Sequence, residues 1–212
     1  SYGVIIDVAQ HRRFRLLGLN TKLILTFIPI MLLLGAGLFL GFEYSNPDTL
    51  GALPVSQKLT TSMFEAVNYT AGFSTIDYAE ANQGTGFIMS ALMFVGGASA
   101  SVAGGIKINT LAVVMVAVAS TVQGRAHASA YGREIPDEQV RRALTVGSIA
   151  LGMLFLVILF LTLSNTTFDF LSLIFESVSA FSTVGLTTGI TPDLSEWGHV
   201  VLVVAMFVGR IG

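Results

Sequence analysis

Cysteine is absent from the 212-residue sequence, and charged residues make up only 11% of it. The lack of cysteine excludes disulfides, thiolate chemistry and cysteine-ligated metals. The low charge excludes an ordinary soluble domain, in which about 25% of residues are charged. Hydrophobic residues instead make up 53% of the chain.

Two long runs contain no charged residue, at 23–42 and 143–163. A helix of about 20 apolar residues spans the hydrocarbon core of a bilayer. The first run follows a basic stretch and has no small-residue cleavage site, so it is not a signal peptide. The sequence therefore predicts a multi-pass integral membrane protein, surrounded by lipid.

Basic residues cluster before each of these runs. They are Arg12, Arg13, Arg15 and Lys22 before the first run, and Arg125, Arg133, Arg141 and Arg142 before the second. The segments that follow the runs, 43–86 and 165–197, are acidic, with Lys58 as their single basic residue. Because cytoplasmic loops collect Lys and Arg, residues 1–22 and 121–142 are predicted to be cytoplasmic.

A glycine motif occurs twice, as TAGFST at 70–75 and as TVGLTT at 183–188. The two copies are 113 residues apart, and MFVG at 93–96 recurs at the same distance, at 206–209. Such fixed-period similarity indicates duplicated structural units. Both units begin inside, so they are predicted to cross the membrane in the same direction.

Each unit has the same predicted order of segments. A spanning helix is followed by a short apolar helix (60–69 or 168–182), the glycine motif, a polar outer loop and a second spanning segment. The short helix cannot cross the membrane and reads as re-entrant. Non-helical backbone at membrane depth is tolerated where it is buried in protein or lines a watery cavity. The two motifs together therefore predict a pore lining. Taken alone, either glycine could instead serve only to let two helices pack closely.

The chemistry of such a lining suits an alkali ion. Rings of backbone carbonyls can replace the water shell of potassium, and glycine permits the positive φ that turns successive carbonyls towards one axis. The neighbouring hydroxyls supply further oxygens or brace the loop. Glu65 and Glu176, one on each short helix, are predicted to brace the motifs through hydrogen bonds, the alternative being a catalytic pair. The predicted filter residues are Thr70, Ala71, Gly72, Phe73, Thr183, Val184, Gly185 and Leu186.

A run of small residues, GGASASVAGG, interrupts the second spanning segment of the first unit. Its low helix propensity predicts an unwound gating loop near mid-membrane; the alternative is a small-residue packing face. It is not a phosphate loop, because Ile106 breaks the required Gly-Lys ending. The position directly after MFVG is Gly97 in the first unit and Arg210 in the second. A charged residue such as arginine is costly at membrane depth. Arg210 is predicted to act as an electrostatic barrier or to pair with the facing loop. The alternative for both Arg210 and Lys107 is a side chain that reaches the membrane interface. The predicted gate comprises Gly96, Gly97, Ala98, Ser99, Ala100, Ser101, Val102, Ala103, Gly104, Gly105, Lys107 and Arg210.

Four stretches, NYTAGFST, GGASASVAGGIK, SAFSTVGLTTGITP and FVGRIG, resemble the third and fourth repeats of the Trk/Ktr/HKT superfamily of potassium transporters, and the Ktr-type membrane subunit most of all. The resemblance implies four repeats around one pore, with Gly72 and Gly185 as filter glycines, a gating loop in the third repeat and Arg210 facing the pore. It further implies a location in the plasma (inner) membrane, a homodimer, a cytosolic nucleotide-binding regulatory subunit, potassium as the ion and, in many systems, a dependence on sodium.

The expected fold is an all-α integral membrane protein with tandem parallel helix–pore-helix–helix repeats, half of a four-repeat assembly. Its segments are a cytoplasmic start (1–22), a pore repeat (23–120), a cytoplasmic linker (121–142) and a second repeat truncated in its last helix (143–212). The expected function is selective, gated potassium uptake or symport, with no organic cofactor and no nucleic acid partner. The alternative is a coupled secondary transporter for another cation or small substrate, a class that typically has inverted repeats. The lack of cysteine, paired histidines and a nucleophile with its base argues against an enzyme.

Overall fold

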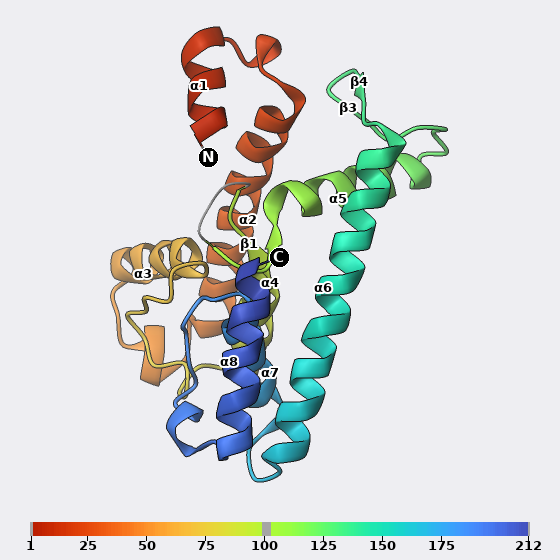
Figure 1. Cartoon of the computed structure of the whole chain (residues 1–212). Coiled ribbons are helices and arrows are strands. Elements are labelled where there is room, and N and C mark those ends of the chain that lie inside the picture. The colour runs from red at the N-terminus through yellow and green to blue at the C-terminus, as the bar shows by residue number, and fades with distance from the viewer. Residues whose placement is uncertain (1, 99–102, 212) are drawn as a thin grey trace.

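Two long helices, α2 (Leu19–Glu43) and α6 (Asp137–Ser164), frame the structure (Figure 1). The computed structural model describes residues 2–98 and 103–211. The helices contain the two uncharged runs, and both are long and apolar enough to cross a membrane. Only 28% of the most apolar stretch of α2 and 11% of that of α6 is buried. The apolar surface faces outward, as in a membrane helix and unlike the core helix of a soluble protein.

Each long helix is followed by a short helix and then by a further apolar helix. α3 (Val55–Asn68) and α4 (Gln83–Phe94) follow α2, and α7 (Phe170–Phe181) and α8 (Glu196–Ile211) follow α6. α3 packs against α2, whereas α7 packs between α4 and α8. α3 starts five residues before the predicted segment, directly after Pro54. Proline suits the beginning of a helix, because the N–H group that it lacks would have no intrahelical partner there.

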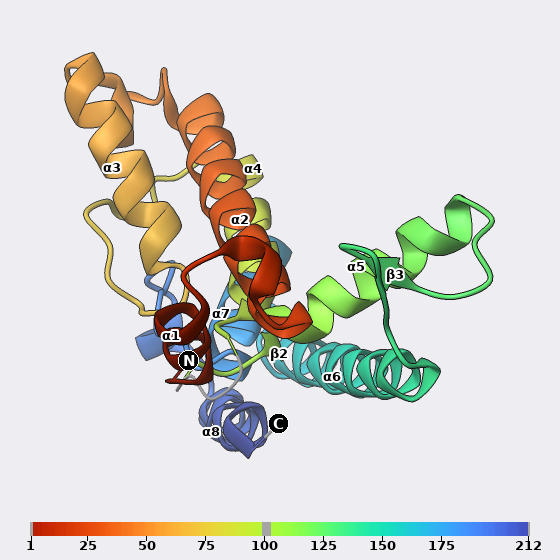
Figure 2. The ribbon, with the colours of Figure 1, turned by 90° about the horizontal axis from the view of Figure 1, so that it is seen from above.

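The chain leaves helical conformation after α4. β1 (Val95–Gly96) pairs in parallel with β2 (Ile106–Lys107), and α5 (Ile108–Val122) follows. The sequence predicted one interrupted spanning segment here, but in the structure α5 does not continue α4 across the membrane. It lies across α6 instead (Figures 1 and 2). The reason is that Lys107, directly before α5, has an extended backbone, which breaks the helical direction.

The segment between α5 and α6 contains an ordered hairpin. β3 (Ser129–Ala130) pairs with β4 (Arg133–Glu134), and both turn residues, Tyr131 and Gly132, have positive φ, as in the tight turns that suit hairpins. The Tyr131 hydroxyl lies 2.5 Å from the Thr26 hydroxyl, and its ring meets the Phe14 ring edge-on. The hairpin is therefore fastened to the start of α2.

The N-terminal helix α1 (Tyr2–His11) is joined to α2 by a 3-10 turn at Phe14–Leu16. The Asp7 carboxylate accepts a hydrogen bond from the Gly18 amide at 2.9 Å. Hydrogen bonds from the Thr21 side chain and the Gly18 amide lower the pKa of Asp7. Asp7 thus remains an anion that holds α1 against the beginning of α2.

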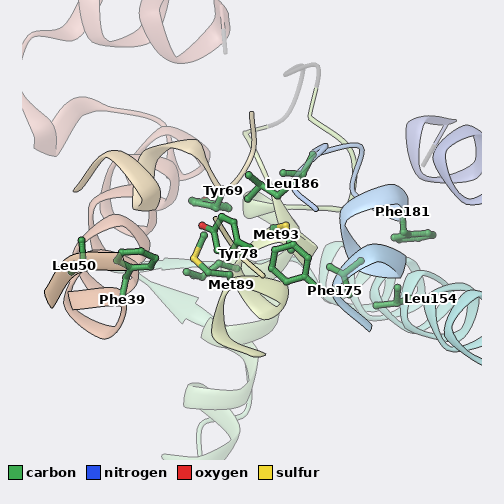
Figure 3. Close-up of a cluster of buried hydrophobic side chains, with 13 residues drawn as sticks. Phe39, Leu50, Tyr69, Tyr78, Met89, Met93, Leu154, Phe175, Phe181 and Leu186 are labelled. Carbon is green, nitrogen blue, oxygen red and sulfur yellow. The ribbon is translucent and has the colours of Figure 1, made fainter. Parts of the chain in front are cut away.

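The main hydrophobic core joins α2, α4 and α7 (Figure 3). The Tyr78 ring packs against that of Phe175 with 5.2 Å between centroids, and the cluster also includes Tyr69 and Leu186. Full burial of one large apolar side chain stabilises a fold by roughly 1.5–3 kcal/mol. Because Tyr69 and Leu186 flank or belong to the two glycine motifs, this core holds both motifs in place.

Candidate ion pathway

The two glycine motifs lie against each other. A Cβ atom added to Gly72 would stand 2.1 Å from the Val184 carbonyl oxygen and 3.3 Å from the Gly185 Cα. Gly72 has a φ of 71° and Gly185 a φ of 100°, a region that L side chains rarely adopt. Position 72 therefore requires glycine for both its backbone conformation and its contact, and the structure brings the predicted filter residues of the two motifs together.

The motifs run between two cavities. The first, which we call the Asp77 cavity, has a volume of about 410 Å³ and is lined by Gly72, Ser74, Thr75, Ile76, Asp77, Tyr78, Gly185, Leu186 and Thr187. The second, the Arg210 cavity, has a volume of about 590 Å³ and is lined by Thr70, Ala71, Gly97, Ala103, Thr183, Val184 and Arg210. Each motif thus begins at the Arg210 cavity and continues to the Asp77 cavity.

A buried carboxylate braces the first motif from behind. Glu65 on α3 has no exposed surface. Its two oxygens accept hydrogen bonds from the Ser74 hydroxyl at 3.0 Å, the Thr75 amide at 2.8 Å, the Thr75 hydroxyl at 2.9 Å and the Tyr78 hydroxyl at 3.0 Å. Hydrogen bonds to a charged group each stabilise a fold by about 1.5–3 kcal/mol. Glu65 therefore fixes the end of the motif to its short helix.

Glu176 on α7 does the same for the second motif. It accepts hydrogen bonds from the Thr187 hydroxyl at 2.6 Å, the Thr188 amide at 2.9 Å and the Thr191 hydroxyl at 2.7 Å. The bracing role predicted for Glu65 and Glu176 is confirmed by these hydrogen bonds. The carboxylates are occupied by their own loops rather than paired with each other in the manner of a catalytic dyad.

The sequence reading missed a third buried carboxylate, Glu43, at the end of α2. It has no exposed surface and accepts hydrogen bonds from the Asn82 amide at 2.9 Å and the Thr49 hydroxyl at 2.6 Å, so it ties α2 to the start of α4. Asn165, after α6, likewise accepts from the Ser195 amide at 2.7 Å. The donors Asn82 and Ser195 keep the repeat spacing of 113 residues, but the acceptors Glu43 and Asn165 are 122 residues apart, so the spacing gave no signal for Glu43.

The two ends of the predicted gating loop, residues 96–105, are held together. A Cβ atom at Gly96 would lie 1.9 Å from the Gly104 carbonyl oxygen. The Ile108 amide donates to the Gly97 carbonyl at 3.3 Å, and the Lys107 ammonium donates to the Ala103 carbonyl oxygen. Gly96, Gly97, Ala98, Ala103, Gly104 and Gly105 are all non-helical. The predicted gate residues Ser99, Ala100, Ser101 and Val102 lie outside the described residues.

Arg210 reaches the cavity because α8 packs closely on the end of α7. A Cβ atom at Gly209 would be 1.6 Å from the Phe181 carbonyl oxygen, so glycine is required for the approach. The next residue, Arg210, lines the Arg210 cavity together with Gly97 and Ala103. The predicted arginine and the described ends of the loop therefore share one cavity.

The two motifs differ in the large residue that follows each glycine. Phe73 is 68% exposed, whereas Leu186 is only 5% exposed and belongs to the core. The surface of α3 is also less covered than that of α7: Leu59, Met63, Phe64 and Val67 are exposed, while most of α7 is buried. One side of the first motif is therefore an open apolar face.

Comparison with known proteins shows that this chain is similar to cation transport proteins. The family model TrkH, described as a cation transport protein, matches residues 11–212. The Ktr system potassium uptake protein B of Bacillus subtilis is 40% identical over the whole chain and 48% of its own length. The potassium/sodium uptake protein NtpJ of Enterococcus hirae is 34% identical over 97% of the chain and 46% of its own length. The chain thus spans about half the length of these curated relatives.

A solved structure has a similar fold. The crystal structure of the potassium transporter TrkH from Vibrio parahaemolyticus superposes with a TM-score of 0.69, covering 91% of this chain and 42% of that one. The two sequences are 20% identical in that comparison, so the likeness concerns the fold alone.

Proposed function

Because this chain belongs to the TrkH family of cation transport proteins, we propose that it is half of the pore-forming membrane subunit of a potassium uptake system. The observation that carries the proposal is the meeting of the two glycine motifs between the Asp77 and Arg210 cavities. Relatives named as potassium uptake proteins support potassium as the ion.

The filter is formed by the backbone carbonyls of residues 70–73 and 183–186. A dehydrated potassium ion needs several oxygens at once, and carbonyl rings supply them without a net charge that would trap the ion. The hydrogen bonds of Glu65 and Glu176 support this assignment, because they hold the carboxyl-terminal ends of both motifs in place. Asp77 in its cavity attracts cations towards the filter.

The gate is formed by the loop 96–105 together with Lys107 and Arg210. Arg210 lines the same cavity as the loop ends, where a positive charge raises the energy of a passing cation. Lys107 holds the exit of the loop through the Ala103 carbonyl. Potassium flow thus requires that the loop and the Arg210 side chain move out of the pathway.

Two repeats in this chain make half of a four-repeat pore. The exposed apolar face of α3 and Phe73 supports the assignment, because an apolar face beside a pore loop suits packing against a neighbouring repeat. In the complete subunit, residues 1–22 and 121–142 face the cytoplasm, where they are available to a nucleotide-binding regulatory subunit. The complete subunit forms a homodimer. Sodium dependence is a further proposal; one relative is named for the uptake of both potassium and sodium.

Ion flux into proteoliposomes that contain the full-length protein tests this function. We expect potassium to enter down its own gradient and faster than sodium at equal concentration. Potassium entry that needs a sodium or proton gradient would indicate symport. The alternative function, a coupled secondary transporter for another cation or small substrate, predicts no selective potassium entry with or without such a gradient. Potassium entry no faster than into protein-free vesicles under either condition would refute the proposed function.

A further inference from the structure

The second glycine motif begins with a residue in an unusual conformation. Thr183 has a φ of 53°, although it is neither glycine nor asparagine. It follows the end of α7, where its amide donates to the Ala180 carbonyl at 3.0 Å and the Val184 amide donates to the Ser179 carbonyl at 2.9 Å. This pair of bonds is the helix ending in which glycine is the usual residue. A threonine at this position is strained, and such strain points to a function.

The side chain of Thr183 contacts the gating loop. Its hydroxyl oxygen accepts a hydrogen bond from the Gly104 amide at 3.1 Å. Gly104 fits closely beneath the end of α7, since a Cβ atom there would lie 2.7 Å from the Ser182 carbonyl oxygen and 2.8 Å from the Thr183 hydroxyl oxygen. The loop exit and the start of the second motif are therefore joined by one hydrogen bond and a glycine contact.

The first motif has no such conformation. Thr70 lines the same Arg210 cavity as Thr183, but it is not among the described residues with positive φ. In the described part of the chain, the link between a glycine motif and the loop exit is made by Thr183. Repetition of the motif therefore does not account for the strained backbone of Thr183. The hydrogen bond between Gly104 and the Thr183 hydroxyl does account for it.

We propose that Thr183 is a positioning residue that latches the exit of the gating loop to the filter. The proposal rests on the proposed function, which assigns the loop as gate and the motif as filter. In the closed state the hydrogen bond holds Gly104, and the loop contact in turn holds Thr183 in its strained conformation. When the loop leaves, Thr183 loses its donor and is free to relax, so the opening of the gate changes the filter entrance.

Hydrogen–deuterium exchange of the full-length protein tests the latch without any measurement of transport. Thr183→Val keeps the β-branched shape but removes the acceptor, and Thr183→Ser keeps the acceptor. One neutral hydrogen bond changes a local opening equilibrium about fivefold. We therefore expect the Gly104 amide to exchange about fivefold faster in Thr183→Val and at the wild-type rate in Thr183→Ser. Equal exchange in all three proteins would overturn the proposal.

Potassium flux then tests what the latch does. Thr183→Val should raise the potassium flux severalfold, and Thr183→Ser, which keeps the acceptor, should raise it less. Thr70→Val removes the matching hydroxyl of the first motif from the same cavity, so it measures the effect of losing a pore hydroxyl alone. The increase in potassium flux in Thr183→Val must exceed any increase in Thr70→Val. Equal increases in the two variants would contradict the latch.

Gly104→Ala offers a second route to the same result. The added Cβ atom must displace the loop from the Ser182 carbonyl, so we expect the variant to match Thr183→Val in flux, and a wild-type flux would contradict the latch. If the wild-type protein showed no potassium selectivity, that result would refute the proposed function. Hydrogen–deuterium exchange of the Gly104 amide would still test its hydrogen bond to Thr183. The two failures are therefore distinguishable.

Discussion

Replacement of Gly185 by serine is the most direct test of the filter assignment. Gly185 has a φ of 100°, and no heavy atom lies within 4 Å of the position of an added Cβ. Serine therefore fits sterically, and the variant should fold. Its backbone, however, favours a left-handed φ of about 50–70°. Holding it at the native angle costs roughly 1–3 kcal/mol, and relaxing it rotates the adjacent carbonyls away from the ion.

The expected result of Gly185→Ser is weaker discrimination of potassium from sodium. If about 1.4 kcal/mol of that strain appears as lost potassium binding, selectivity falls about tenfold. The assay is competitive uptake of potassium and sodium by proteoliposomes that contain the full-length protein. Unchanged selectivity and an unchanged rate in Gly185→Ser would refute the assignment.

Gly189→Ser is the matched control for that experiment. Gly189 has a φ of 88° and equally open space around its Cβ position, but it lies outside the predicted filter. The backbone cost of serine should therefore be similar at both positions. We expect Gly189→Ser to keep its potassium selectivity, so a loss at position 185 alone can be attributed to the filter.

Three further predictions follow from the contacts of the site. Gly72→Ala places a Cβ atom 2.1 Å from the Val184 carbonyl oxygen, so we expect abolished potassium uptake and a lowered melting temperature; normal uptake would contradict the packing of the two motifs. Glu176→Ala should destabilise the protein by about 3 kcal/mol or more in thermal unfolding and Glu176→Gln by less, whereas equal effects would contradict charge-assisted bracing. Deletion of residues 98–103 should raise potassium flux severalfold, and a folded but inactive variant would argue against a gate.

The sequence was sufficient to predict which parts of the site come together. The constant spacing of 113 residues between the copies indicated equivalent positions, and the structure brings Gly72 against Val184 and Gly185. The bracing by Glu65 and Glu176 was also predictable, because each glutamate lies on a short apolar helix a few residues before its motif. A carboxylate in such a place must find hydrogen-bond donors, and the hydroxyls of the motif are the nearest.

The path of the chain around the gating loop was not predictable. Four glycines and no bulky residue between positions 96 and 105 indicate a loss of helix, but they do not specify where the chain re-enters. The parallel pairing of β1 with β2 and the crosswise course of α5 depend on contacts such as the bond from Ile108 to Gly97. The hairpin at Tyr131 was missed for a similar reason, since a tyrosine with positive φ gives little signal in a sequence.

The two glycine motifs have similar sequences but different physical roles. Gly72 is confined by the Val184 carbonyl, so the first motif cannot change without moving the second. Gly185 faces open space, and Thr183 is held by a single hydrogen bond to the loop exit. The second motif is also held by Ser179 on α7, whose hydroxyl donates to the Leu186 carbonyl oxygen at 2.6 Å and accepts a hydrogen bond from the Gly185 amide at 3.1 Å. If ion selection depends on the position of its carbonyls, changes in the gating loop should alter selectivity through Thr183, whose hydroxyl accepts the hydrogen bond from the loop exit.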